Sequence, residues 1–218
     1  MMIKRKLNPD FREGIDRKDL TILCRRFLSL AKVRLQRTRM AMTARQQIVL
    51  DVLPLLFHVN HPLLPGYVSR QTPHIVRHFA PGKEVLRQAQ RLSRSFRYRE
   101  VDNKHGDIIS IFLMGSTGSV AHSVSSDLDI WLCYRNGLSR KLLNELASKA
   151  EQVSEWAAEM GAEVHIFLMN AADFRQGRAT AAADSEDCGT AQQYLLLDEF
   201  YRTGIWLAGA YPLWWLIP

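Results

Sequence analysis

The stretch that decides the fold runs from Phe112 to Tyr134 and reads FLMGSTGSVAHSVSSDLDIWLCY. It begins with apolar residues, passes through a loop of glycine, serine and other small residues, and ends in an apolar run that contains Asp127 and Asp129. Because residues i and i+2 of a strand point to the same face, we expect the two carboxylates to lie side by side, with Leu128 facing the core. The stretch therefore predicts two strands joined by a loop, the second strand acidic in front and apolar behind.

Two adjacent carboxylates repel each other unless a cation lies between them, and a divalent metal ion is the usual cation. The preceding loop contains Gly115, Gly118 and several serines, whose N–H and hydroxyl groups can hold phosphate oxygens. It lacks the glycine-lysine ending of a Walker A loop and the third glycine of a dinucleotide-binding loop. The alternative is a small-residue turn with two solvated aspartates, but the combination of loop and carboxylates favours a metal–phosphate site.

The composition is that of a soluble globular protein, with 218 residues, of which 47% are hydrophobic and 23% charged. No apolar run reaches the roughly 18 residues needed to span a bilayer, and the N-terminus lacks the apolar segment of a secretory signal. The cysteines Cys24, Cys133 and Cys188 show no CxxC spacing, which argues against a disulfide framework and a zinc site. We therefore expect a cytoplasmic protein without a membrane span.

The net charge of +7 hides an asymmetry between the two halves of the chain. Residues 1–105 carry 22 Lys/Arg against 8 Asp/Glu, whereas residues 106–218 carry 7 against 14. A basic half can bind nucleic acid or an anionic membrane surface, or its charges can solvate helix faces and meet an acidic partner. The basic half has no recognised nucleic-acid motif and few aromatic residues, so we favour the second interpretation and do not expect nucleic acid as a partner.

The first half of the chain shows helical periodicity. The spacing predicts helices over 19–42, 43–59 and 83–100, with a proline-rich loop over 60–83. Thr43 and Gln46 have the spacing of a capping box, and Pro54 is expected to kink or end the second helix.

In the second half the period changes. We expect strands over 107–115, 127–134 and 162–170, and helices over 138–161 and 190–209. Ser139 is the expected N-cap of the first of these helices and Gly161 its C-terminal stop.

This order of elements indicates an α+β fold: a basic helical region over 1–105, then a core over 106–218 with a small mixed sheet flanked by helices. The chain ends on YPLWWLIP, residues 211–218, which is more apolar than a natural terminus usually is. We therefore expect the core to be truncated and to continue in a longer protein.

The central pattern is a hydrophobic residue, Gly115–Ser116, ten residues, then Asp127 and Asp129, each followed by a hydrophobic residue. It resembles the signature of the DNA polymerase β-type nucleotidyltransferase superfamily. The resemblance implies a polymerase β-like core, a Gly-Ser pair that holds the β- and γ-phosphates of a nucleoside triphosphate, and two aspartates that hold two divalent metals. It also implies a third carboxylate on a later strand. Glu163 is the one carboxylate on the strand expected over 162–170, although it could also be solvated at the strand edge.

A longer match narrows the resemblance. MGSTGSVAHSVSSDLDIWLC (114–133) together with EDCGTAQQYLLLDEFYRTGIWLAG (186–209) is similar to the class I adenylate cyclases of gammaproteobacteria. The resemblance implies a phosphorus–oxygen lyase that converts ATP to 3′,5′-cyclic AMP and pyrophosphate with two Mg²⁺ ions, for which Mn²⁺ can substitute. It also implies a large C-terminal regulatory region outside this chain. His165 departs from the pattern, since we expect a small or apolar residue there; it could be a packed histidine.

Seven residues make up the expected site. Asp127, Asp129 and Glu163 are the expected catalytic residues and metal ligands, and the expected substrate-binding residues are Gly115, Ser116, Ser119 and Trp131. Trp131 shares a strand face with the aspartates, so it could stack on adenine or wall the metal site, or it could be a core tryptophan. The cation that holds the triphosphate is left open among Lys104, Arg175, Arg178 and Arg202. An ion pair with an acidic neighbour on the same helix is the favoured role for Arg202.

Two other functions remain open at this point. One is a nucleotidyltransferase that acts on RNA, on a protein or on a small molecule, although the block over 186–209 is not expected in such enzymes. The other is an inactive fragment whose basic half binds nucleic acid or a partner.

Overall fold

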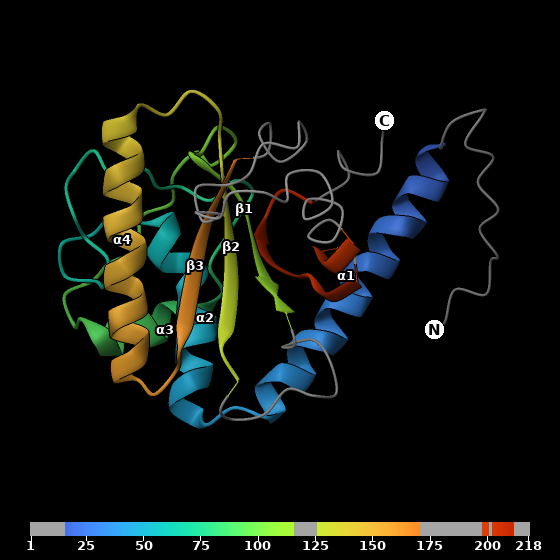
Figure 1. Cartoon of the computed structure of the whole chain (residues 1–218), viewed down its shortest axis with the longest axis horizontal. Helices are drawn as coiled ribbons and strands as arrows, with labels where there is room; N and C mark the ends of the chain where they lie inside the picture. Colours follow the sequence, from blue (N-terminus) through green and yellow to red (C-terminus); the bar gives the residue numbers. More distant parts are fainter. Residues whose placement is uncertain (1–15, 116–125, 171–197, 201, 212–218) are drawn as a thin grey trace, which may run out of the picture.

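The computed structural model describes residues 16–115, 126–170, 198–200 and 202–211, and it forms a four-stranded sheet with helices against it (Figure 1). The elements in chain order are α1(Arg17–Met40), α2(Ala44–His58), α3(Lys83–Leu92), β1(Ile108–Met114), β2(Leu128–Tyr134), α4(Arg140–Glu159), β3(Val164–Asn170) and β4(Ile205–Gly209). Within the described residues, no helix is both long enough and apolar enough to cross a membrane.

The sheet is mixed, as expected. Its strand order is β3-β2-β1-β4, with β1 antiparallel to both β2 and β4 and with β2 parallel to β3. A parallel pair needs a crossover connection, and α4 provides it between β2 and β3. Figure 1 shows α4 running alongside β3. The arrangement confirms a small mixed sheet flanked by helices.

The larger hydrophobic core lies between one face of the sheet and helices α2 and α4. Alternating strand residues such as Ile111, Leu113 and Ile130 are fully buried in it. The second half of α2 is apolar around nearly its whole circumference and is buried there, whereas α4 contributes one stripe. This core contains residues from both sides of position 105, so the helical region and the sheet share it; the division into two domains stays a prediction.

A smaller core covers the opposite face of the sheet. It contains Phe112, Met114, Trp131, Cys133, Met169 and Phe200, with Phe27 of α1 packed against it. The sheet is therefore covered on both faces, which favours a functional site at the ends of its strands.

The helix starts follow the predicted caps. The backbone N–H of Thr43 donates to Gln46 Oε1 over 2.8 Å, and the N–H of Gln46 donates to Thr43 Oγ1 over 3.3 Å, which completes the capping box. Ser139 caps α4, with its Oγ accepting from the N–H of Leu142, and Gly161 follows the helix with a φ of +80°. These predictions are confirmed.

Pro54 does not end α2, which continues to His58, because the helix is buried through this segment and its packing outweighs the loss of one backbone hydrogen bond. A kink at Pro54, the other expected outcome, stays a prediction. The end of the next helix was predicted wrongly. Helix α3 ends at Leu92 and not at residue 100; Ser93 follows in an extended conformation. The basic residues beyond it belong to a loop.

The helix predicted over 190–209 is also wrong at its end, because Ile205–Gly209 is strand β4; residues 190–197 lie outside the described part of the chain. The N–H of Gly204 bonds to the carbonyl of Phe200, and a Cβ at Gly204 would lie 2.6 Å from that oxygen. The chain leaves the helix at this glycine. It then pairs with β1, whose backbone groups on that side would otherwise lack partners.

Candidate metal and nucleotide site

The candidate site lies where β1 ends and β2 begins. Met114, the last residue of β1, pairs with Asp129 of β2, and Gly115 follows with a φ of +73°. A Cβ at Gly115 would lie 3.0 Å from Asp129 Oδ2. Glycine therefore permits both the left-handed backbone and the close approach of the carboxylate. The loop over 116–125, with the predicted phosphate ligands Ser116 and Ser119, lies outside the described residues.

Strand β3 brings the third carboxylate to the same end of the sheet. The N–H of Leu128 donates to the carbonyl of Glu163 over 2.9 Å, and Asp129 lies beside His165 in the parallel ladder. Asp127 and Glu163 each stand immediately before their strands and not within them as predicted. The parallel register nevertheless places the two residues next to each other at neighbouring strand ends.

Three side chains converge at this end. Asp127, Glu163 and His165 each offer one ligand atom, and these atoms lie within 4.8 Å of one another. His165 Nε2 lies 3.4 Å from Glu163 Oε1 and 3.9 Å from Asp127 Oδ2. All three side chains are exposed, so an ion from solvent can reach them.

Asp129 lies beside this group but is half-buried. Burial raises the pKa of Asp129 above its ordinary value, His165 acts in the opposite direction, and the negative charge of Asp127 raises the pKa further. The carboxylate is thus held where its charge is not fully compensated by the protein. A cation between Asp127 and Asp129 would stabilise the charged form of Asp129 and reduce the repulsion between the two carboxylates.

The donor set fits a divalent metal ion. Carboxylate oxygens suit Mg²⁺ and Mn²⁺, and an imidazole nitrogen extends the preference toward transition metals. The sequence pattern predicts the carboxylates but only a packing role for His165. The signal was present: His165 is two residues from Glu163 on one strand, and therefore on the same face.

Trp131 lies two residues further along β2. It is 6% exposed, and its ring stacks on Phe200 at a centroid distance of 5.5 Å and an interplanar angle of 10°. Its burial fits the core role that was one of its alternatives. A contact between Trp131 and adenine stays a prediction.

The candidates for the triphosphate cation are only partly described. Arg202 forms an ion pair with Asp198 on the same helix, Nε to Oδ2 over 2.8 Å, as the favoured alternative predicted. Lys104 is exposed and precedes the start of β1, whereas Gly115 follows its end. Arg175 and Arg178 lie outside the described residues.

Comparison with known proteins assigns the family. The sequence matches the family described as "Adenylate cyclase NT domain" over residues 19–215, which is most of the chain. The chain belongs to this family. It is 37% identical over 207 residues to an adenylate cyclase of Yersinia intermedia, and 36% identical over 198 residues to adenylate cyclases of Salmonella typhimurium and Escherichia coli. Each alignment covers 90% of this chain, which spans about 23% of the length of these relatives.

Among solved structures, one described as "Crystal structure of the toxin-antitoxin with AMP-PNP" aligns with 52% of this chain and 70% of its own at 18% identity. Its TM-score is 0.30, which is too low to assign a fold. Membership of the adenylate cyclase family therefore rests on sequence, and the polymerase β-like core stays a prediction.

Proposed function

We propose that this chain forms the catalytic part of an adenylate cyclase, which converts ATP to 3′,5′-cyclic AMP and pyrophosphate in the cytoplasm. The observation that carries the proposal is the convergence of Asp127, Glu163 and His165 beside Asp129, in a chain that matches the adenylate cyclase family over residues 19–215. The relatives are about four times longer, so a C-terminal regulatory region, and any dependence of activity on it, is part of the proposal.

Asp127, Asp129 and Glu163 are the proposed ligands of two Mg²⁺ ions, with His165 as an additional ligand. These ions, when bound, would favour ionisation of the ribose 3′-hydroxyl and neutralise charge on the departing pyrophosphate. Glu163 is the most exposed of these carboxylates, with 68% of its side chain accessible, and in this proposal it would accept the hydroxyl proton or act as a ligand.

The proposed phosphate cradle begins at Gly115. Its left-handed backbone turns the chain at the point where Asp129 approaches. With Ser116 and Ser119 it would supply donors to the β- and γ-phosphates, and the attack of the 3′-oxygen on the α-phosphorus would displace pyrophosphate. Asp129, half-buried at the base of this turn, would be held in place by the sheet while the ligands around it are exposed.

The identity of the product tests the reaction class. The chain is incubated with α-labelled ATP and Mn²⁺, with and without added RNA and protein acceptors, and the products are separated by chromatography. The proposal expects labelled cyclic AMP in amounts that do not depend on the acceptors. Label on a macromolecule would instead establish a nucleotidyltransferase. Tight, salt-dependent nucleic-acid binding without turnover would favour a binding role for the basic half.

A further inference from the structure

A hollow lies at the end of β1 opposite the carboxylate site. It has a volume of about 490 Å³ and is lined by three segments: residues 58–61 at the end of α2, residues 74–75, and residues 95–99 with Val101 after α3. Val76, which follows the second segment, bridges to Ile108 at the start of β1, whereas Gly115 follows its end. A strand of this length spans about 20 Å, so the hollow is separate from the carboxylate site. Its volume is in the range of small-molecule pockets, roughly 300–1,000 Å³.

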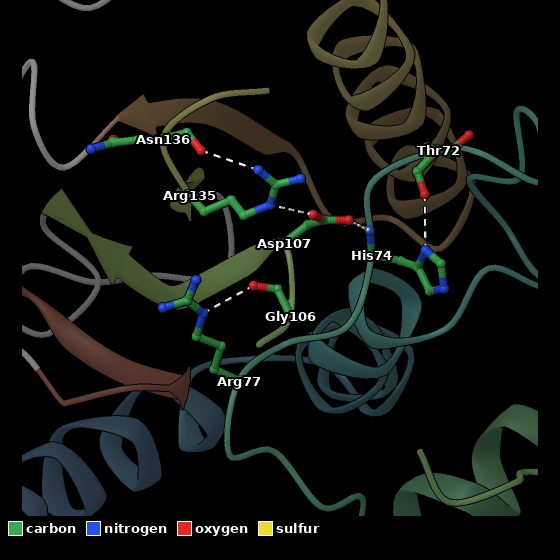
Figure 2. Close-up of polar contacts among 7 residues, drawn as sticks. All are labelled: Thr72, His74, Arg77, Gly106, Asp107, Arg135 and Asn136. Atoms are coloured by element: carbon green, nitrogen blue, oxygen red, sulfur yellow. Dashed lines mark hydrogen bonds and ion pairs between the residues drawn. The ribbon is translucent and has the colours of Figure 1, made fainter. Parts of the chain in front are cut away.

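The lining is positively charged. Its cationic side chains are Arg97 and Arg99, and none of the described residues that line it is an aspartate or glutamate. Two carboxylates act on lining residues: burial and, to a smaller extent, the charge of Glu100 raise the pKa of Tyr98, and the charge of Asp107 acts on His74. Asp107 is engaged elsewhere: Arg135 Nε donates to it over 2.7 Å, and the backbone N–H of His74 donates over 3.4 Å (Figure 2). The hollow therefore attracts an anion, and guanidinium groups are suited to hold phosphate or carboxylate.

Hydrogen bonds around His58 leave the hydroxyl group of Tyr98 as a donor in the hollow. The N–H of Val76 donates to His58 Nδ1 over 3.2 Å, so the neutral ring carries its proton on Nε2 and donates to Tyr98 Oη over 3.1 Å. Burial lowers the pKa of His58, which keeps the ring neutral at pH 7. Tyr98 accepts this bond, so its own hydroxyl proton is directed to another acceptor.

Backbone groups also bind Nδ1 of the other two histidines, His61 and His74. The N–H of Leu63 donates to His61 Nδ1 over 3.2 Å, so the neutral His61 ring carries a donor on Nε2. His74 is fixed by the bond between its Nδ1 and the carbonyl of Thr72, at 2.9 Å (Figure 2). The three histidine rings are thus oriented by protein contacts before any ligand binds.

The remaining wall is apolar and aromatic. Phe96 is buried, and its ring packs edge-on against His61 at a centroid distance of 5.2 Å. Ile75 and Val101 complete this side. An apolar wall beside cationic donors suits a molecule that has a flat ring at one end and a negative charge at the other.

We propose that this hollow binds a small organic anion that carries a flat ring, at a site independent of the catalytic carboxylates. Arg99 and Arg97 supply the charge, Tyr98 and His61 donate hydrogen bonds, and Phe96 contacts the ring. A concave volume of about 490 Å³ favours a small molecule over a macromolecular partner.

The test is a calorimetric titration of the chain with 1-naphthyl phosphate in EDTA, which removes the divalent ions that the carboxylate site requires. We expect a dissociation constant below about 1 mM. Arg99→Ala and Tyr98→Phe should each weaken binding by about tenfold, since each removes one donor to a charged ligand. Arg140→Ala is the control: it removes the same charge from an exposed position at the start of α4, outside the lining, and should leave binding within about twofold. Thermal melts confirm that each variant is folded.

Three results would overturn the proposal. The first is absence of binding by the folded parent chain at millimolar ligand. The second is an equal effect of Arg140→Ala and Arg99→Ala, which would indicate general attraction to a basic surface. The third is loss of binding in Asp129→Asn with retention in Arg99→Ala, which would place the ligand at the carboxylate site.

Discussion

A methyl group on Gly115 would lie 3.0 Å from Oδ2 of Asp129, so the carboxylate occupies the space that a side chain at residue 115 would need. Gly115 also has a φ of +73°, where a side chain costs about 1–2 kcal/mol. We expect Gly115→Ala to lower stability by about this amount and to weaken Mn²⁺ binding by about tenfold, because Asp129 must move. Spin-resonance titration of Mn²⁺ measures the second effect.

Gly137→Ala provides the matched control for this prediction. Gly137 has a φ of +78°, but its added Cβ would meet only Arg135 Nη1, at 3.9 Å. The control should lose similar stability and keep its Mn²⁺ affinity. Equal loss of affinity in both variants would show that backbone strain, and not contact with Asp129, is responsible.

His165 should influence which metal binds. Its Nε2 lies 3.4 Å from Glu163 Oε1, and nitrogen ligands favour transition metals over Mg²⁺. We expect His165→Ala to weaken Mn²⁺ binding by about tenfold and Mg²⁺ binding by less than about threefold, with Mg²⁺ measured by competition. His105→Ala, an exposed histidine before β1, is the control. A parallel loss of both metals, or no loss, would remove His165 from the ligand set.

Asp129 should destabilise the metal-free chain at neutral pH. Burial raises its pKa in the folded state, so below that raised value the folded chain holds a proton that the unfolded chain has lost. Stability from this group therefore falls as pH rises from the unfolded pKa through the folded one. Asp129→Asn should raise the free energy of unfolding at pH 7 by less than about 1 kcal/mol, because water screens a half-exposed carboxylate.

Urea denaturation in EDTA at several pH values measures this gain, with exposed Glu151→Gln on α4 as the control. The advantage of Asp129→Asn should vanish near pH 4. A variant less stable than the parent at pH 7 would show that the carboxylate is satisfied without a cation.

Lys149 should give the chain a pH-dependent stability. Lys149 belongs to α4, its side chain is buried, and its Nζ donates to the carbonyl of Val59 over 3.0 Å. Burial lowers the pKa of Lys149 to about 7. Between this value and the ordinary 10.5, the unfolded chain holds a proton that the folded chain lacks, so stability rises with pH across this window. The slope is at most about 1.4 kcal/mol per pH unit.

Lys149→Met should remove that slope. Urea denaturation at pH 7, 8 and 9 compares it with the parent and with Lys141→Met, an exposed lysine on the same helix. We expect the parent and Lys141→Met to share the slope. A slope that persists in Lys149→Met would assign it to another group.

Local signals in the sequence were sufficient for much of the fold. The caps at Thr43 and Ser139 form through bonds within four residues. The first three strands are short apolar runs rich in β-branched and aromatic residues, which favour strands. Strand β4 could not be predicted in this way, since Ile205–Gly209 becomes a strand only by pairing with β1, about a hundred residues away.

The site followed a similar pattern. The spacing of Asp127 and Asp129 was enough to predict carboxylates at a strand end. The two-residue spacing of Glu163 and His165 was enough to expect them on one face. The position of His165 beside Asp129 depends on the parallel register of β2 and β3, which no local pattern encodes. The burial of Trp131 likewise depends on Phe200, from a distant part of the chain.

The most direct test of the account is cyclic AMP formation from ATP and Mn²⁺ by the parent chain beside Asp127→Asn and Asp129→Asn. We expect cyclic AMP and pyrophosphate in equal amounts from the parent, and a loss of at least about a hundredfold in both folded variants, because each loses a proposed metal ligand. Cyclic AMP formation that persists in both variants would contradict the account. So would a parent chain that neither forms cyclic AMP nor binds ATP in a Mn²⁺-dependent manner.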